Sequence, residues 1–320
     1  MTDLPKFVEF HEEGPREGFQ IEPVSYPLER RAALIDSLSG TGLKQIQVGS
    51  FVSPKVVPTM ADTAELFGAI KRKEGVEYTA LWLNKKGFML AGEAPRVDMD
   101  TRLLFYATDA FSQANNNCSA TEMRDRQVEW LDLYLQQGLA PASAYIMTAF
   151  GCNFGGPVPI EAVTDLVQWI IDLCAARAVP LPAIYLADTV GWANPEDMKR
   201  RIGAVRELAP DARIGLHLHD TRGLGAANVY AALQMGVDLF DASVAGLGGC
   251  PFAGHGSASS AGNICTEDMV FLCEEMGIDT GIDLDALIQS ALLAEDIIGR
   301  PLNGRIMHAG SLTKYRSRLA

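Results

Sequence analysis

The stretch that decides the fold runs from residue 214 to residue 263 and begins IGLHLHDTRGLGAAN (214–228). It continues, after a short helical pattern, as LFDASVAGLGGCPFAGHGSASSAGN (239–263). His217 and His219 stand two residues apart at the end of an apolar run, and residues i and i+2 of a β-strand point to the same face. The pattern therefore predicts a buried strand whose imidazoles converge on a candidate metal site. A buried strand with two hydrogen-bonded histidines and no metal is the alternative.

Seven further apolar runs resemble this one and alternate with longer helical patterns. The predicted strands are residues 7–10, 45–48, 78–83, 103–107, 144–148, 183–186, 213–217 and 239–243. The predicted helices between them are residues 28–38, 61–72, 85–91, 121–137, 160–177, 195–208 and 226–235. Strands that alternate with helices pair in parallel, and eight such units predict an α/β fold, a (β/α)8 TIM barrel. We expect one catalytic domain over residues 1–320, with a C-terminal helical extension from about residue 266 that contains helices 266–275 and 284–298.

Composition narrows the class of protein. The 320 residues are 48% hydrophobic and carry a formal net charge of -13, which argues against nucleic acid or an anionic membrane as a partner. The six cysteines show no CxxC spacing, so we expect a reduced, cytoplasmic setting. The first residues lack the basic-then-apolar order of a signal peptide, and no apolar run is long enough to span a bilayer.

Polar residues that could bind a ligand or take part in catalysis follow the predicted strands. They are Arg16 and Glu17 after the first strand, Gln47 and Ser50 at the second, Asn84 after the third, Asp188 and Thr189 after the sixth, His217 and His219 at the seventh, and Cys250 and Asn263 after the eighth. In a (β/α)8 barrel the loops after the strands build the active site, so these side chains are predicted to gather at one face.

The residue types suggest a chemistry. Two imidazoles with oxygen ligands suit an octahedral cation, Mg²⁺, Mn²⁺ or Co²⁺, with positions open for substrate. A cation that polarises a hydroxyl or carbonyl, together with Arg16 to stabilise an enolate, indicates metal-assisted lyase or aldolase chemistry. For Cys250, a small hydrophobic role in a glycine-rich loop is as compatible with its spacing as catalysis is. For Arg16, a surface ion pair with Glu13 or Glu17 is the alternative.

Several segments resemble hydroxymethylglutaryl-CoA lyase, in the superfamily of metal-dependent lyases and condensing enzymes with a (β/α)8 barrel. The segment EGPREGFQIE (13–22) is similar to the family's GPRDGLQNE, and SFVSPKVVPTMAD (50–62) to its SFVSPKWVPQMAD. The segments NNNCS (115–119), LADTVG (186–191), HLHDTRGLGAAN (217–228) and AGLGGCPFA with GNICTEDMVF (245–271) follow in the family's order. The resemblance covers nearly the whole chain.

The resemblance implies a role for each matching residue. His217, His219 and Asn263 would bind the metal, with Glu17 completing the site directly or through water. Arg16 would stabilise the enolate of the departing acetyl-CoA, and Cys250 would supply a proton to it or organise its loop. His217 or the carboxylate beside Arg16 would be the base. Further residues are expected near the substrate or the ligands: Gln47, Ser50, Asn84, Asp188, Thr189 and Glu267. No residue is assigned to an organic cofactor.

Departures from the family pattern bear on the substrate. Glu17 replaces the family's aspartate, and Gln47 replaces a glutamate, which removes one negative charge. The loop from Cys250 to Asn263 is longer, in the segment 254–258, and gains His255, which we interpret as a loop residue. Pro23 stands at a basic position of the family. Together these changes predict either altered chemistry or an acyl group other than hydroxymethylglutaryl, one that is bulkier or differently substituted. Because Gln47 is neutral, we also expect Arg16 to be freer to contact substrate.

The leading hypothesis is a divalent-metal acyl-CoA lyase that forms a homo-oligomer, a dimer or tetramer. A condensing synthase or an aldolase of the same superfamily is the second reading. A non-catalytic relative that binds acyl-CoA or a partner protein is the third, and the residues at positions 17 and 47 support it. The cysteine loop favours the lyase.

Overall fold

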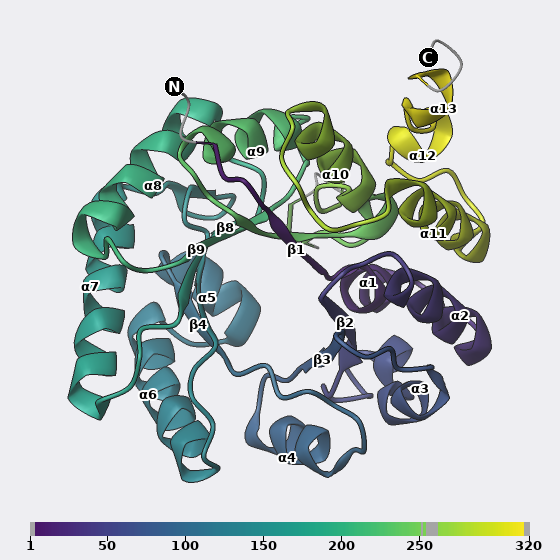
Figure 1. Ribbon diagram of the computed structural model, residues 1–320. Coiled ribbons are helices and arrows are strands. Elements are labelled where there is room, and N and C mark those ends of the chain that lie inside the picture. The colour runs from purple at the N-terminus through teal and green to yellow at the C-terminus, as the bar shows by residue number, and fades with distance from the viewer. Residues whose placement is uncertain (1–3, 251, 254–261, 317–320) are drawn as a thin grey trace. The chain divides into compact units, whose positions relative to one another are not determined.

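The computed structural model describes residues 4–250, 252–253 and 262–316 (Figure 1). Its main strands are β1 (Glu9–Glu12), β2 (Gln45–Ser50), β3 (Glu77–Leu81), β4 (Arg102–Tyr106), β5 (Ser143–Met147), β8 (Ala183–Asp188), β9 (Ile214–Leu218) and β10 (Leu239–Ala242). Two short strands, β6 (Gly151–Cys152) and β7 (Gly156–Pro157), form a separate antiparallel hairpin. In the eight-stranded sheet the order is β3-β2-β1-β10-β9-β8-β5-β4. This is the chain order of the strands around a cycle, as in a (β/α)8 barrel, so the predicted fold class is confirmed.

Helices separate the strands along the chain. They are α1 (Phe19–Ile21), α2 (Leu28–Ser39), α3 (Thr63–Ala69), α4 (Lys85–Glu93), α5 (Asp109–Asn116), α6 (Ala120–Gln136), α7 (Ile160–Arg177), α8 (Pro195–Leu208), α9 (Gly225–Gln234), α10 (Thr266–Glu275), α11 (Leu284–Ile298), α12 (Ile306–Ala309) and α13 (Thr313–Arg316). Helical turns form η1 (Gly14–Gly18), η2 (Pro58–Met60) and η3 (Val244–Gly246). None of the helices in the described ranges is both long and apolar enough to cross a membrane.

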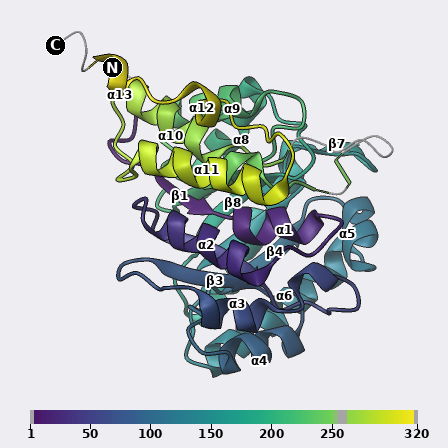
Figure 2. The same cartoon turned by 90° about the vertical axis from the view of Figure 1, so that its right-hand side faces the viewer.

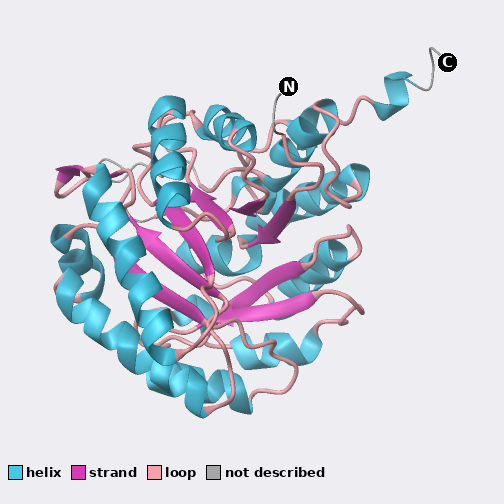
Figure 3. Ribbon diagram, turned by 60° about the vertical axis from the view of Figure 1, so that its left-hand side comes forward, coloured by secondary structure: helices cyan, strands magenta, loops and turns pink. Residues whose placement is uncertain are grey.

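The first compact unit comprises residues 1–5, 100–240 and 250–260. Its strands β4, β5, β8 and β9 form consecutive parallel ladders, in which Arg102 pairs with Ser143 and Ser143 with Ala183. Helix α6 packs on β4, α7 on β5 and α8, and α8 on α9. Figure 3 shows the strands in magenta and the helices in cyan. Fully buried apolar side chains such as Leu131 and Ile170 fill the layer between strands and helices.

The second compact unit comprises residues 6–99, 241–249 and 261–320. Parallel ladders join β1 to β2 and β2 to β3. Helix α11 packs beside α2 although the two are far apart in the sequence (Figure 2), and the hydroxyls of Ser37 and Ser290 lie 2.7 Å apart between them. Helices α10 and α11 begin and end where the sequence predicts. The expectation of a single catalytic domain stays a prediction.

The first strand is shifted from its predicted position. The apolar pattern predicts residues 7–10, whereas β1 spans Glu9–Glu12 and pairs His11 with Gln45. Phe7 makes only an isolated bridge with Asp279 and is 43% exposed. The polar end of β1 is buried because hydrogen bonds to the Glu12 carboxylate offset its desolvation. Helix α5 was not predicted, because its sequence DAFSQANN is short and rich in asparagine.

Candidate metal and acyl-CoA site

The turn η1 places Arg16 directly after β1. Glycines permit the turn: a Cβ at Gly14 would lie 2.6 Å from Glu12 Oε1, and a Cβ at Gly18 would lie 2.7 Å from the Cβ of Leu247. Glu13 N–H donates to the carbonyl of Ala242 at 2.9 Å, which ties the turn to the end of β10. Arg16 is buried as a result, with 7% of its surface exposed.

The guanidinium of Arg16 contacts three side chains. Nη2 donates to Glu13 Oε2 at 2.6 Å, and Nε donates to Gln47 Oε1. Nη1 lies 3.5 Å from Glu17 Oε1. Arg16 thus forms ion pairs with Glu13 and Glu17, but the surface setting of the alternative reading is wrong, because Arg16 and Glu13 are buried. The expectation that a neutral Gln47 leaves Arg16 freer is also wrong, because both Gln47 and Glu13 hold it.

Asn263 lies beside Glu17 within the same unit. Its Nδ2 donates to Glu17 Oε2 and to Ser243 Oγ at 2.9 Å, and lies 3.3 Å from the carbonyl of Leu247. Asn263 is 3% exposed, and its Oδ1 makes no hydrogen bond to any atom of the described residues. A buried carbonyl oxygen without a hydrogen-bond donor is costly unless a ligand supplies a positive charge. Asn263 Oδ1 is therefore suited to a cation.

Two buried carboxylates hold the turn η3, which precedes the Cys250 segment. Glu12 accepts from Gly14 N–H and Val244 N–H, each at 2.8 Å, and from the Thr266 hydroxyl at 2.7 Å. Glu267 Oε2 accepts from Ala245 N–H at 3.0 Å. Burial raises the pKa of Glu12 to about 7 and that of Glu267 to about 8. Glu267, predicted near the ligands, thus supports a turn whose Leu247 carbonyl lies beside Asn263.

The histidine pair lies in the first unit, at the end of β9. The rings of His217 and His219 have centroids 5.0 Å apart, so the predicted convergence of the pair is confirmed. His219 Nδ1 is 3.1 Å from the backbone carbonyl of Asp188, which orients the ring. Tyr145 has its ring centroid 6.4 Å from that of His217 and stacks on Tyr185 at 4.2 Å. The Tyr145 ring therefore packs edge-on beside His217.

The predicted polar residues after β8 are buried and hydrogen-bonded. Asp188 is 1% exposed, and its carboxylate accepts from the N–H groups of Trp192 at 2.7 Å and Ala193 at 3.1 Å. Burial raises the pKa of Asp188 to about 6. Thr189 Oγ1 accepts from Thr148 N–H at 2.7 Å. Both residues therefore shape the backbone next to the histidine pair.

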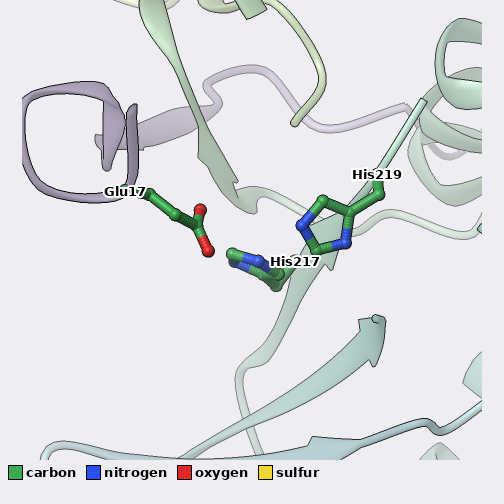
Figure 4. Close-up of side chains that lie close together, drawn as sticks. All are labelled: Glu17, His217 and His219. Carbon is green, nitrogen blue, oxygen red and sulfur yellow. The ribbon is translucent and has the colours of Figure 1, made fainter. Parts of the chain in front are cut away.

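Glu17, His217 and His219 are one group of possible metal ligands, with one ligand atom from each within 4.8 Å of the others (Figure 4). Glu17 is half-buried and both histidines are buried. In Figure 4 the Glu17 carboxylate points toward the His217 ring. Two imidazoles and a carboxylate are a donor set for a divalent cation.

The remaining predicted residues have other surroundings. Cys250 is half-buried and packs against a cluster that contains Tyr106, Phe111 and Val190. Ser50 is buried and its hydroxyl donates to Gln20 Oε1 at 3.1 Å. Asn84 is exposed and caps α4 by accepting from Gly87 N–H at 2.9 Å. His255 and the lengthened segment 254–258 lie outside the described residues.

Sequence reasoning missed Glu12 as a site residue and considered Glu13 only as a surface partner of Arg16. Their position at the end of the first strand, directly before GPREG, is the signal that was available. Ser243 and Tyr145 were also missed; Ser243 closes the predicted strand 239–243, whereas Tyr145 lies inside β5. Ser243 contacts Asn263, and Tyr145 contacts His217. Both contacts join residues far apart in the sequence, so no local sequence pattern shows them.

Comparison with known proteins places these features in a family. The family model described as HMGL-like matches residues 7–293. The chain is 37% identical over 310 residues to a 3-hydroxy-3-isohexenylglutaryl-CoA/hydroxy-methylglutaryl-CoA lyase of Pseudomonas aeruginosa, covering 96% of this chain and 98% of the relative.

Solved structures agree with this match. A hydroxymethylglutaryl-CoA lyase from Pseudomonas aeruginosa superposes with a TM-score of 0.86 at 36% identity and covers 96% of this chain and 98% of its own. An HMG-CoA lyase from Acinetobacter baumannii, in complex with coenzyme A and 3-methylmalate, gives a TM-score of 0.84 at 38% identity, with 96% of each chain covered.

The fold and the metal-ligand group define a class of barrel proteins that includes carbon–carbon lyases. This chain belongs to the HMGL-like family, and the family resemblance seen in the sequence is confirmed.

Proposed function

We propose that this protein is a divalent-metal-dependent acyl-CoA lyase. It cleaves a carbon–carbon bond of a 3-hydroxy-3-methylglutaryl-CoA-like thioester and releases acetyl-CoA with a keto acid or ketone. The group of Glu17, His217 and His219 is the observation that carries the proposal. The relatives' names, which specify lyases of this class, and the coenzyme A bound to one of them support the substrate class.

The proposed ligands are His217, His219, Asn263 and Glu17. Two imidazoles and two oxygens fit Mg²⁺ or Mn²⁺, with Co²⁺ as a further option. The buried Asn263 Oδ1, which accepts no hydrogen bond from the described residues, supplies the fourth donor. When bound, the cation lowers the pKa of the substrate hydroxyl and polarises the adjacent oxygen.

The chain's own residues then move protons and stabilise charge. His217, or the carboxylate of Glu17, accepts the proton of the tertiary hydroxyl. As the carbon–carbon bond breaks, its electron pair passes to the acetyl thioester and forms an enolate, whose charge Arg16 stabilises. Cys250 donates a proton to the enolate carbon, which completes acetyl-CoA.

The acyl group is proposed to be bulkier than hydroxymethylglutaryl. Glu17 and Pro23 depart from the family pattern, and a relative at 37% identity is named for an isohexenylglutaryl thioester as well as for the methyl compound. We also propose that the protein forms a homo-oligomer. A cytoplasmic location is proposed from the cysteine pattern, and named relatives include cytoplasmic and mitochondrial lyases.

A panel of 3-hydroxyacyl-CoA thioesters tests the proposal. The series runs from hydroxymethylglutaryl-CoA to analogues with longer branches at C3, and kcat/KM for acetyl-CoA release is measured with Mg²⁺ or Mn²⁺. We expect at least one thioester to react at about 10⁴ M⁻¹s⁻¹ or above, with a longer branch preferred. If no thioester in the panel is cleaved, the lyase proposal is contradicted, and a non-catalytic relative that binds acyl-CoA or a partner protein is favoured. If the protein condenses an acyl-CoA with a carbonyl compound but cleaves no thioester, a condensing synthase of the same superfamily is favoured.

A further inference from the structure

We propose that Glu13 is a positioning residue for Arg16 and replaces the carboxylate that the family has at position 47. The inference rests on the proposed function, since it assigns Arg16 to the developing enolate. We assign Glu13 no contact with substrate or metal. It acts through the guanidinium, which it holds in one orientation.

The geometry of Glu13 is fixed on both its backbone and its side chain. Its N–H donates to the Ala242 carbonyl at 2.9 Å, and its own carbonyl accepts from Arg16 N–H at 3.1 Å and Glu17 N–H at 2.8 Å. Its side chain is fully buried and accepts from Arg16 Nη2 at 2.6 Å. One residue therefore determines both the path of the turn and the direction of the guanidinium.

Positions 13 and 47 each follow directly after the last residue pair of the β1–β2 ladder. The ladder between β1 and β2 pairs His11 with Gln45 and ends with the pair Glu12 and Ile46. Both side chains reach the same guanidinium, Glu13 at Nη2 and Gln47 at Nε. A carboxylate at either position faces the same cation, so the charge can move between the two without changing the local total.

Charge explains why one of the two must be a carboxylate. A buried guanidinium needs an ionised partner, because removing one member of a buried pair leaves the other uncompensated. Gln47 contributes an oxygen but no charge, and its Nε2 is buried without a hydrogen bond to the described residues. Glu17 also faces Arg16, but at 3.5 Å, and it is a proposed metal ligand. Glu13 is thus the carboxylate dedicated to Arg16.

Moving the carboxylate tests the proposal. The variants are Glu13→Gln, Gln47→Glu and the double variant Glu13→Gln with Gln47→Glu, with Glu29→Gln as a control at an exposed position of α2. We expect Glu13→Gln to lower kcat about 100-fold, with KM within about 3-fold, because the guanidinium loses orientation for the transition state. The double variant should regain kcat to within about 5-fold of the parent.

Urea unfolding of the parent and the same four variants gives a readout that does not depend on activity. Glu13→Gln should shift the unfolding midpoint downward, and adding Gln47→Glu should return it. A folded Glu13→Gln variant with unchanged kcat would overturn the proposal, as would a double variant no better than Glu13→Gln in both readouts. If the parent cleaves no thioester, the proposed function fails, and the unfolding measurements alone then test the exchange of the carboxylate between positions 13 and 47. Unfolding midpoints that show no coupling between these two positions would overturn the exchange.

Discussion

The histidine pair on β9 and the arginine turn after β1 contrast in how their geometry arises. His217 and His219 converge because two residues of one strand share a face, a property of the backbone alone. Arg16 is oriented by Glu13 on its own turn and by Gln47 on the neighbouring strand. Strand periodicity is visible in sequence, whereas the set of partners around a buried charge depends on strand register.

The contrast has a functional counterpart. The histidines offer ligand atoms, and their substitution should act first on metal binding. Arg16 offers positive charge to a transition state, and its substitution should act on kcat. Variants that separate metal affinity from turnover therefore test whether the two regions have these different tasks.

Arg16→Gln should have the largest effect on catalysis. We expect kcat to fall by several powers of ten with KM within a few-fold, a loss of about 4 kcal/mol or more of transition-state stabilisation. The matched control is Arg30→Gln, which removes an exposed ion pair with Asp296. Steady-state kinetics decide the matter: a change confined to KM would assign Arg16 to substrate binding.

His219→Ala should abolish metal binding. An open site has few ligands, and each contributes a large share of the affinity, so we expect no Mn²⁺ binding that the titration can detect. Calorimetric titration with Mn²⁺ measures it, with His308→Ala, in an ion pair with Glu295, as the control. Unchanged Mn²⁺ affinity in His219→Ala would mean that the pair is a hydrogen-bonded core feature.

Cys250→Ser should separate chemistry from metal binding. If the thiol donates a proton to the enolate, turnover should fall by about 100-fold or more while Mn²⁺ affinity stays at the parent value. The same calorimetry and kinetics measure both quantities. A variant with nearly normal turnover would support a packing role against the Tyr106 and Phe111 cluster.

The smallest expected effect concerns stability. Glu12 and Glu267 have pKa values raised by burial to about 7 and about 8, so the folded chain binds their protons more tightly than the unfolded chain. Their contribution to the free energy of unfolding is therefore present below about pH 4.5 and is lost as the pH rises through 7 to 8. Glu267→Gln removes one of these groups.

Urea unfolding at pH 5.5 and pH 8.5 compares the parent with Glu267→Gln. We expect the parent to lose more stability over this range than the variant does. Equal losses in the two proteins would show that Glu267 does not change its proton affinity on folding.

Sequence alone predicted the parts of the molecule that local physics determines. The eight-unit alternation, the limits of α10 and α11, and the same-face placement of the histidines follow from periodicity and capping. The position of β1 did not, because its register depends on buried hydrogen bonds to Glu12 from Val244 and Thr266, more than two hundred residues away. The burial of Glu13 beside Arg16 has the same origin. Long-range pairing decides which polar groups are buried, and no local pattern encodes it.

We propose that this chain uses a divalent cation, held through the β9 histidines, to cleave an acyl-CoA. The most direct measurement is acetyl-CoA release from the preferred thioester after the purified protein is treated with a chelator and then given Mn²⁺. We expect loss of activity on chelation, recovery with Mn²⁺ or Mg²⁺ in the parent, and no recovery in His219→Ala. Cleavage that persists at the full rate without metal, or a His219→Ala protein that recovers like the parent, would contradict it.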